Sequence, residues 1–256
     1  MKLYSVHRKL ASGSLMFLLF AIALFGSEAR AQDWPQWRGP HRDGVVAGFR
    51  APKKWPGQLK QIWKVAIGEG HSTPVVSAGR VYTIARQGEQ EVIAAYNLAD
   101  GKLLWKDSYP AAYRMNPAAT GHGKGPKSTP VIAEGKLCTL GITEVLSCYD
   151  LATGKLKWRK EFGSQYKQTS PTFGTAMSPV IDRGLLIAHV GGPGQGALTA
   201  FDLNTGAVKW NWADDGPAYA SPVIAEFGGV RQAITQSQSN VIGVATTNGA
   251  LLTWRN

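Results

Sequence analysis

The chain has 256 residues, and its 28 Lys and Arg against 17 Asp and Glu give it a net charge of +11. The basic residues are scattered through predicted turns and strand ends, without a basic run or a basic-aromatic alternation. This distribution argues against a nucleic-acid-binding protein. The two cysteines have neither a Cys-x-x-Cys-His nor a zinc-like spacing, which excludes attached haem and a zinc site.

Residues 1–31 have the pattern of a secretory signal peptide. A basic start with Lys2, Arg8 and Lys9 is followed by an apolar run of about a dozen residues, too short to span a bilayer comfortably. Residues 29–31 (Ala-Arg-Ala) fit a signal-peptidase site. No cysteine near this site could accept a lipid. We therefore expect a periplasmic or secreted chain, cleaved near Ala31, that is neither a lipoprotein nor membrane-spanning.

Residues 32–60 are predicted to form an irregular N-terminal extension. Repeated Pro and Gly, as in Trp34-Pro-Gln-Trp-Arg-Gly-Pro40 and Trp55-Pro-Gly57, exclude a helix. The Trp residues argue against disorder, because disordered segments lack aromatic residues. Residues 61–68 follow as a predicted outer strand that carries Trp63.

An eleven-residue pattern organises the rest of the chain. It reads Cys148-Tyr-Asp-Leu-Ala-Thr-Gly-Lys-Leu-Lys-Trp158 and recurs at residues 95–105 and 200–210. In a worn fourth copy at 244–254, Thr246 replaces the acid and Gly249 comes one place early. The acid can bond turn amides, Gly supplies a positive φ, and Trp offers a flat surface for burial. The predicted structural repeat residues are Trp63, Trp105, Trp158, Trp210, Trp254, Asp150, Asp202, Gly101, Gly154 and Gly206.

A second recurring motif, which we call the Ser/Thr-Pro mark, precedes each copy of the eleven-residue pattern. Together the two motifs delimit a unit of four predicted strands. A Ser/Thr-Pro step followed by apolar residues recurs at 72–76, 128–132, 177–181 and 220–224, and Pro suits the start of an edge strand. Two apolar strands and the Trp strand follow in each unit. The Trp residues recur at about 40–50 residues, the period of propeller blades. We predict an all-β fold in which residues 61–256 form the propeller part. Its four-stranded antiparallel blades are expected at about 71–109, 127–162, 176–213 and 219–256.

The two cysteines lie in consecutive predicted strands joined by a tight turn. Cys138 and Cys148 could face each other across the hairpin, and an exported compartment permits a disulfide. Cys148 also aligns with Ala95 and Ala200, as a small buried residue would. A disulfide and a reduced pair both remain open.

The repeat resembles that of pyrroloquinoline-quinone (PQQ)-type β-propellers. The segments from Trp34 to Pro40, His122-Gly-Lys-Gly-Pro126 and Gly191-Gly-Pro193 resemble an exported bacterial branch of PQQ-like repeat proteins. Such proteins usually close with seven or eight blades. The resemblance therefore implies a truncated partial ring, and whether further blades are encoded downstream stays open. An incomplete ring would leave unpaired blade faces, through which copies could self-associate.

The chemistry of the chain is less marked than its architecture. His122 and Lys124 lie in a Gly-rich loop and are the ligand-binding candidates, because rigidly held loops often carry function. His189 is interpreted as a core or inter-blade residue, and Asp214-Asp215 as a turn cap. No catalytic or metal constellation is found, and Gly191 to Gly196 lacks the features of a phosphate loop.

Two functions are compatible with the sequence. The first is an exported non-catalytic scaffold or binding module without a definite cofactor, whose protein partner or small ligand is unknown. The second, implied by the resemblance, is a fragment of a PQQ- and calcium-dependent dehydrogenase acting on alcohols or sugars. The adjacent cysteines expected of such an enzyme are absent from the sequence.

Overall fold

The protein is described by a computed structural model, which places residues 32–166 and 171–255. Asp33–Asn256 forms one compact unit, and all strands belong to it. The predicted signal peptide, residues 1–31, lies outside the described residues.

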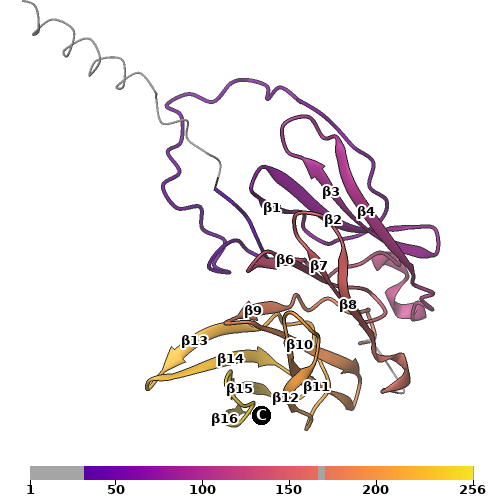
Figure 1. Ribbon diagram of the computed structural model, residues 1–256, viewed down its shortest axis with the longest axis vertical. Helices are drawn as coiled ribbons and strands as arrows, with labels where there is room; N and C mark the ends of the chain where they lie inside the picture. The colour runs from indigo at the N-terminus through magenta and orange to yellow at the C-terminus, as the bar shows by residue number, and fades with distance from the viewer. Residues whose placement is uncertain (1–31, 167–170, 256) are drawn as a thin grey trace, which may run out of the picture. The chain divides into compact units, whose positions relative to one another are not determined.

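In the described part of the chain, sixteen strands form four antiparallel four-stranded sheets, in which each strand pairs with the next within its sheet (Figure 1). Two short 3-10 helices, η1 (Pro117–His122) and η2 (Phe162–Ser164), lie between sheets. Blade 1 contains β1 (Val75–Ser77), β2 (Arg80–Gln87), β3 (Gln90–Asn97) and β4 (Leu103–Pro110). Blade 2 contains β5 (Val131–Ala133), β6 (Lys136–Leu140), β7 (Val145–Asp150) and β8 (Leu156–Glu161). Blade 3 contains β9 (Val180–Asp182), β10 (Leu185–Gly192), β11 (Gln195–Asp202) and β12 (Val208–Trp212). Blade 4 contains β13 (Val223–Phe227), β14 (Val230–Gln236), β15 (Val241–Ala245) and β16 (Leu251–Arg255). The predicted all-β fold of four-stranded blades is confirmed.

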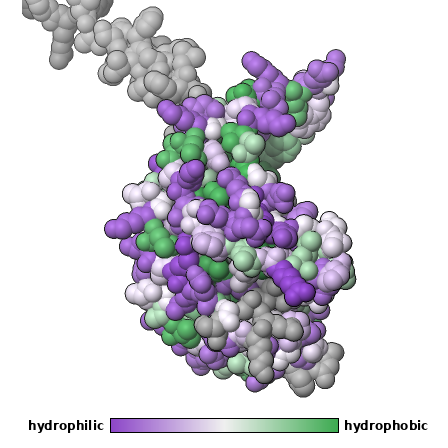
Figure 2. Space-filling model, turned by 90° about the vertical axis from the view of Figure 1, so that its right-hand side faces the viewer, coloured by the Kyte–Doolittle hydropathy of each residue, from purple (hydrophilic) through white to green (hydrophobic). Residues whose placement is uncertain are grey.

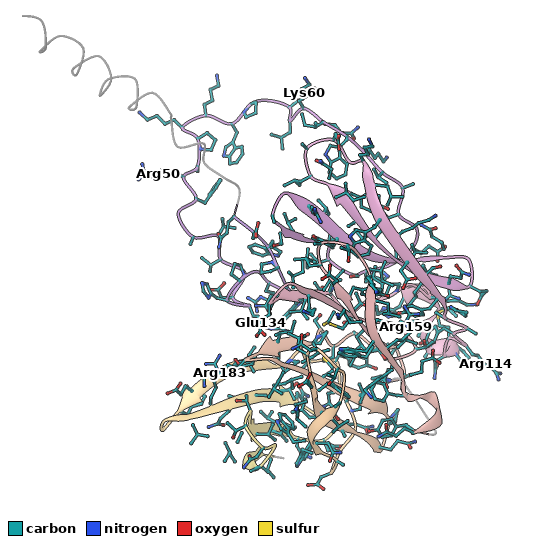
Figure 3. The ribbon with its side chains drawn as sticks, viewed as in Figure 1. Arg50, Lys60, Arg114, Glu134, Arg159 and Arg183 are labelled. Carbon is teal, nitrogen blue, oxygen red and sulfur yellow. The ribbon has the colours of Figure 1, made fainter. Side chains whose placement is uncertain are left out.

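The first two strands of each blade are joined by a two-residue turn with positive φ at both positions. In blade 2 these residues are Glu134 (φ 50°) and Gly135 (φ 69°). Positive φ at both positions is the feature of a type I′ turn, whose twist matches that of the flanking strands. Neighbouring turns also touch, since the Gly184 N–H donates to Glu134 Oε1 at 2.9 Å, and Figure 3 shows Glu134 near Arg183.

The hydrophobic core lies between successive blades. One cluster joins blades 1 and 2, and includes Tyr82 and Tyr149; another joins blades 2 and 3 around Phe201. A third joins blades 3 and 4, with Trp210 and Ile242. Because the middle strands have neighbours on both faces, they are buried almost continuously rather than in alternation.

Trp63, Trp105, Trp158 and Trp210 each cover a glycine in the next copy of the pattern. A Cβ on Gly206 would lie 2.7 Å from the Trp158 ring, and the Trp158 Nε1–H donates to the Leu203 carbonyl at 3.0 Å. The turn beneath is fixed by Asp202, whose Oδ1 accepts the Thr205 N–H at 3.0 Å. The same ring-over-glycine contact joins Trp63 to Gly101, Trp105 to Gly154 and Trp210 to Gly249.

The contact between Trp105 and Gly154 differs from the others in its hydrogen bonding. The Trp105 Nε1–H is buried and has no hydrogen-bond partner among the described residues. The Tyr82 hydroxyl instead donates to the Leu151 carbonyl at 3.4 Å. Trp105 lies between the rings of Tyr82 and Tyr149, with centroids about 6 Å away.

The fourth copy of the pattern has a different register from the one predicted. Gly243 pairs with Thr253, as Ala95 pairs with Trp105 in blade 1. Thr253 therefore occupies the repeat position, and Trp254 lies one residue beyond it. The Gly249 N–H donates to the Ala245 carbonyl, as the Gly154 N–H does to Asp150, so Gly249 is in its usual place and Ala245, not Thr246, replaces the acid.

The strand predicted at residues 61–68 is not formed. Among the residues that the structure describes, the one bridge beside this segment joins Glu69 to Arg86, and a strand needs a neighbour to complete its hydrogen bonds. Trp63 nevertheless makes the contact of the other repeat Trp residues, since its Nε1–H donates to the Leu98 carbonyl at 2.8 Å.

Candidate functional site

The Ser/Thr-Pro marks form a hydrogen-bonded ladder that links the blades. The Thr73 N–H donates to Thr129 Oγ1 at 3.3 Å, and the Thr129 N–H donates to Ser178 Oγ at 2.9 Å. The Ser178 N–H continues the series to Ser221 Oγ at 2.9 Å. Each hydroxyl is the residue directly before the Pro of the mark. The repeated Ser or Thr thus fixes the start of one inner strand against the next, a role that the sequence analysis missed.

The N-terminal extension crosses the inner strands of three blades. We call residues 33–44 the strap. Trp34 pairs with Val76 of β1, and the Pro35 carbonyl accepts the Ile132 N–H at the middle of β5. Arg42 reaches the start of blade 3, where its guanidinium donates to the carbonyls of Ser178 and Pro179 at 3.0 and 3.1 Å. The strap therefore occupies backbone groups at inner edges that would otherwise lack partners.

A row of aromatic side chains runs along the segments that lead into successive blades. We call His122, Phe173 and Tyr219 the connector row. The His122 ring meets Phe173 edge-on with centroids 5.3 Å apart, and Phe173 lies 6.1 Å from Tyr219. The Phe173 N–H also donates to the Tyr219 hydroxyl at 3.2 Å. Phe173 and Tyr219 are 37% and 45% exposed, so the row offers apolar surface to solvent.

The two ligand-binding candidates predicted from the sequence lie at one end of this row. His122 ends η1 and is exposed, and its carbonyl is 3.0 Å from His71 Nε2. Lys124 points to a different partner, because its Nζ lies 3.9 Å from Glu89 Oε1. The structure thus places His122 in the connector row but not Lys124, and their role in binding stays a prediction.

Buried carboxyl groups tie neighbouring blades together. Glu91 of blade 1 accepts the Tyr109 hydroxyl at 2.6 Å and the Ile142 N–H at 2.8 Å. Glu144 of blade 2 accepts the Gly191 N–H at 2.6 Å. Burial raises the pKa of both carboxyl groups, that of Glu144 well above the usual range. Each buried carboxyl group therefore connects its own blade to the next, Glu91 through Ile142 and Glu144 through Gly191.

His189 and Asp215 join blades 3 and 4. The Asp215 carboxylate accepts bonds from the Ser237 hydroxyl, the Ser239 N–H and the Asn240 amide at 2.7 to 3.1 Å. His189 Nε2 lies 3.0 Å from the Asp215 carbonyl oxygen, and burial lowers the His189 pKa to about 4. Asp215 thus caps a turn and His189 is an inter-blade core residue, as the sequence analysis interpreted them.

Apolar surface elsewhere is dispersed. On the face drawn in Figure 2, apolar patches are separated by hydrophilic side chains. Among the described residues, no helix is long and apolar enough to cross a membrane.

A family comparison matches the repeat region. The family model described as outer membrane protein assembly factor BamB, of the PQQ type, matches residues 89–256, which is more than half of the chain. The chain belongs to this PQQ-type β-propeller family. The resemblance that the Trp-containing repeat indicated is therefore confirmed.

Two relatives similar in sequence to this PQQ-type propeller are named as different enzymes. Tetrathionate hydrolase of Acidithiobacillus ferrooxidans is 26% identical over 164 residues, covering 60% of this chain and 30% of that protein. Quinohemoprotein alcohol dehydrogenase ADH-IIG of Pseudomonas putida is 26% identical over 168 residues, covering 61% and 21%. The structure of a P. putida ADHIIG has a TM-score of 0.51 at 16% identity, covering 73% and 34%, and shares the fold. The chain thus spans less than a third of either curated relative.

The described residues of this propeller do not fit a quinone and calcium centre. Calcium needs several oxygen ligands, and no three His, Cys, Asp or Glu side chains come together in residues 32–166 and 171–255. The cysteines are free and lie inside blade 2, where Cys138 faces Cys148 in the strand pairing with the Sγ atoms 2.6 Å apart.

Proposed function

We propose that this PQQ-type propeller is an exported, non-catalytic binding module that holds an extended segment of a protein partner on its connector row. The observation that carries the proposal is the solvent-exposed contact of His122, Phe173 and Tyr219. Export rests on the signal-peptide pattern of residues 1–31.

The connector row has the chemistry of a protein-binding surface. Aromatic residues are enriched in protein interfaces, where they supply large contact areas at a low cost in conformational entropy. Phe173 is held from both sides, by His122 and by the bond from its N–H to the Tyr219 hydroxyl. A surface organised before binding loses less conformational freedom when the partner docks. The partner segment should therefore carry aromatic or aliphatic side chains that pack against these rings.

Selection from a random phage-displayed peptide library on the purified, full chain would test this proposal. We expect the selected peptides to be rich in aromatic and aliphatic residues and to lose binding to a Phe173→Ser, Tyr219→Ser double variant. Phe227→Ser is the matched control, because Phe227 is a 60% exposed aromatic residue in the inner strand of blade 4, away from the row. Selected peptides that bind the double variant as well as the unmodified chain would contradict the proposal.

The similarity to ADH-IIG favours a second candidate, a fragment of a PQQ- and calcium-dependent dehydrogenase acting on alcohols or sugars. Adding PQQ and calcium to the purified chain and following dye reduction with alcohols or aldoses separates the two candidates. Turnover would overturn the non-catalytic proposal, whereas an absence of PQQ binding in a direct titration would remove the dehydrogenase.

A further inference from the structure

A cavity of about 280 Å³ lies between the strap and the inner strands of blades 3 and 4. Gln36, Pro40, His41 and Arg42 line it from the strap, and β9 and β13, which lie next to each other in Figure 1, line it from the blades. We call it the strap pocket. Its volume is near the lower end of the range of about 300–1,000 Å³ that is usual for small-molecule sites.

The strap pocket contains a buried guanidinium that no carboxylate of the described residues neutralises. Arg42 is 7% exposed, and the partners of its Nη atoms are neutral oxygens of Gln36, Ser178 and Pro179. Its Nε is buried and has no partner among the described residues. Burial lowers the Arg42 pKa to about 10, as expected for a cation removed from water without a counter-ion.

The other charges of the pocket cancel each other. Arg231 binds Asp182 through two nitrogens, with Nε 3.0 Å from both carboxylate oxygens and Nη2 2.7 Å from Oδ1. The Asp182 side chain is therefore already engaged and cannot serve Arg42. The Arg42 charge is then left without a counter-ion in the lining, so a monoanion would balance it.

The remaining wall of the pocket is aliphatic. Val180 and Ile181 come from β9, and Val223 and Ile224 come from β13. A guanidinium recognises the planar, two-oxygen head of a carboxylate, and aliphatic side chains favour an apolar body attached to it. Inorganic anions would satisfy only the first of these features.

We propose that the strap pocket binds a small organic monocarboxylate, with the carboxylate facing Arg42 and the hydrocarbon part against the aliphatic side chains of β9 and β13. The site is built jointly by the strap and the blades. It is independent of the connector row, because none of its lining residues belongs to that row.

Calorimetric titration of the full chain with butyrate, with butyramide as the uncharged analogue and with inorganic phosphate would test the site. We expect butyrate to bind at least about ten-fold more tightly than butyramide, because a charged hydrogen bond is lost with the amide. Phosphate should bind more weakly than butyrate. Equal binding of butyrate and butyramide, or tighter binding of phosphate, would overturn the proposal.

Three variants locate the binding. Arg42→Met should abolish butyrate binding. Arg38→Met should retain it, because Arg38 lies over the Trp37 ring as Arg42 does but is an exposed strap residue outside the pocket. Arg42→Met also removes strap contacts, so Val223→Asp provides a second test that leaves the strap unchanged. Its carboxylate would enter a 37% exposed position in the pocket wall and should also abolish binding. Unchanged butyrate binding in Val223→Asp or Arg42→Met would overturn the assignment.

Discussion

A glycine under a tryptophan ring occurs both in the strap and between blades, in different settings. In the strap, a Cβ on Gly39 would lie 2.7 Å from the Trp34 ring, five residues away in the chain. Between blades, a Cβ on Gly154 would overlap the ring of Trp105, which belongs to another sheet. Both glycines have positive φ, +82° and +73°. The local geometry is therefore shared, but only the second contact holds two sheets together.

This difference suggests separate roles for the two regions: contacts between blades stabilise the fold, and contacts of the strap form the strap pocket. The blades are joined by buried side chains, with clusters that continue from one sheet to the next. The strap is joined to them mainly through backbone bonds and through Arg42. Loss of a strap contact should therefore alter the strap pocket, whereas loss of an inter-blade contact should lower the free energy of unfolding of the chain.

The largest expected effect is that of Gly154→Ala. The added methyl group must displace the Trp105 ring, and it also forces a non-glycine residue into positive φ. Overpacking costs about 1–3 kcal/mol and the backbone conformation about 1–2 kcal/mol. We expect the free energy of unfolding to fall by about 3 kcal/mol in urea titrations. Gly88→Ala is the matched control, since Gly88 has φ +59° but open space around its Cβ position, and should cost only about 1–2 kcal/mol.

Gly39→Ala is the corresponding substitution in the strap, because Gly39 also lies under a tryptophan ring. It should displace Trp34 and weaken butyrate binding, while the urea transition of the blades moves little more than that of Gly88→Ala. If Gly39→Ala destabilised the chain as much as Gly154→Ala, the strap would be part of the cooperative core, and the distinction between the two regions would be lost.

A smaller effect is expected from acid, and it should come from the blades. His189 has a folded pKa of about 4 against an ordinary value of 6.5, so the unfolded chain binds more protons between these values. Stability is therefore present above pH 6.5 and is lost as the pH falls towards 4, by at most about 3 kcal/mol. Urea titrations across this pH range should show that His189→Gln removes much of the slope of the unfolding free energy against pH.

One outcome would contradict this assignment. If the slope of unfolding free energy against pH survived unchanged in His189→Gln, the acid-sensitive group would lie elsewhere in the chain, and His189 would not carry the effect.

Sequence reasoning succeeded where the chain repeats itself. The four-stranded blades and the positive φ of Gly206 follow from residue types that recur at one spacing. It failed where the pattern weakens. In blade 4, the identity of Trp254 suggested an alignment that the strand register moved by one residue, because pairing is set along the whole strand and not by one aromatic side chain.

The strap pocket could not be predicted for a different reason. Arg42 touches Ser178 and Pro179, which lie more than 130 residues away, and nothing in the local sequence indicates this contact. The hydrogen-bonded ladder of Ser and Thr residues at the inner strands could be predicted only in part. Its Ser and Thr residues were visible as a repeat before Pro, but their bonding partners belong to neighbouring blades and emerge only when the inner strands lie side by side.

The smallest expected effect concerns Cys138 and Cys148, which lie wholly within blade 2. They are directly opposite in an antiparallel pair, where the Cα separation suits a disulfide. Oxidised glutathione should convert them: two S–H bonds break, one S–S bond forms, and two electrons and two protons reduce the glutathione disulfide. Burial raises the Cys138 pKa well above its ordinary value, so reaction should be slow in the folded chain and faster in urea.

Mass spectrometry after alkylation in denaturant would measure this oxidation. We expect the thiols to be lost together and the free energy of unfolding to rise by about 2 kcal/mol, with butyrate binding at the strap pocket unchanged. Cys148→Ala is the control, since aligned strands carry Ala95 and Ala200 at this position, and it cannot form the bond. Two alkylatable thiols after refolding with oxidised glutathione would contradict the pairing. A change in butyrate binding would instead show that the interior of blade 2 is coupled to the strap, which the separate contacts of the two regions argue against.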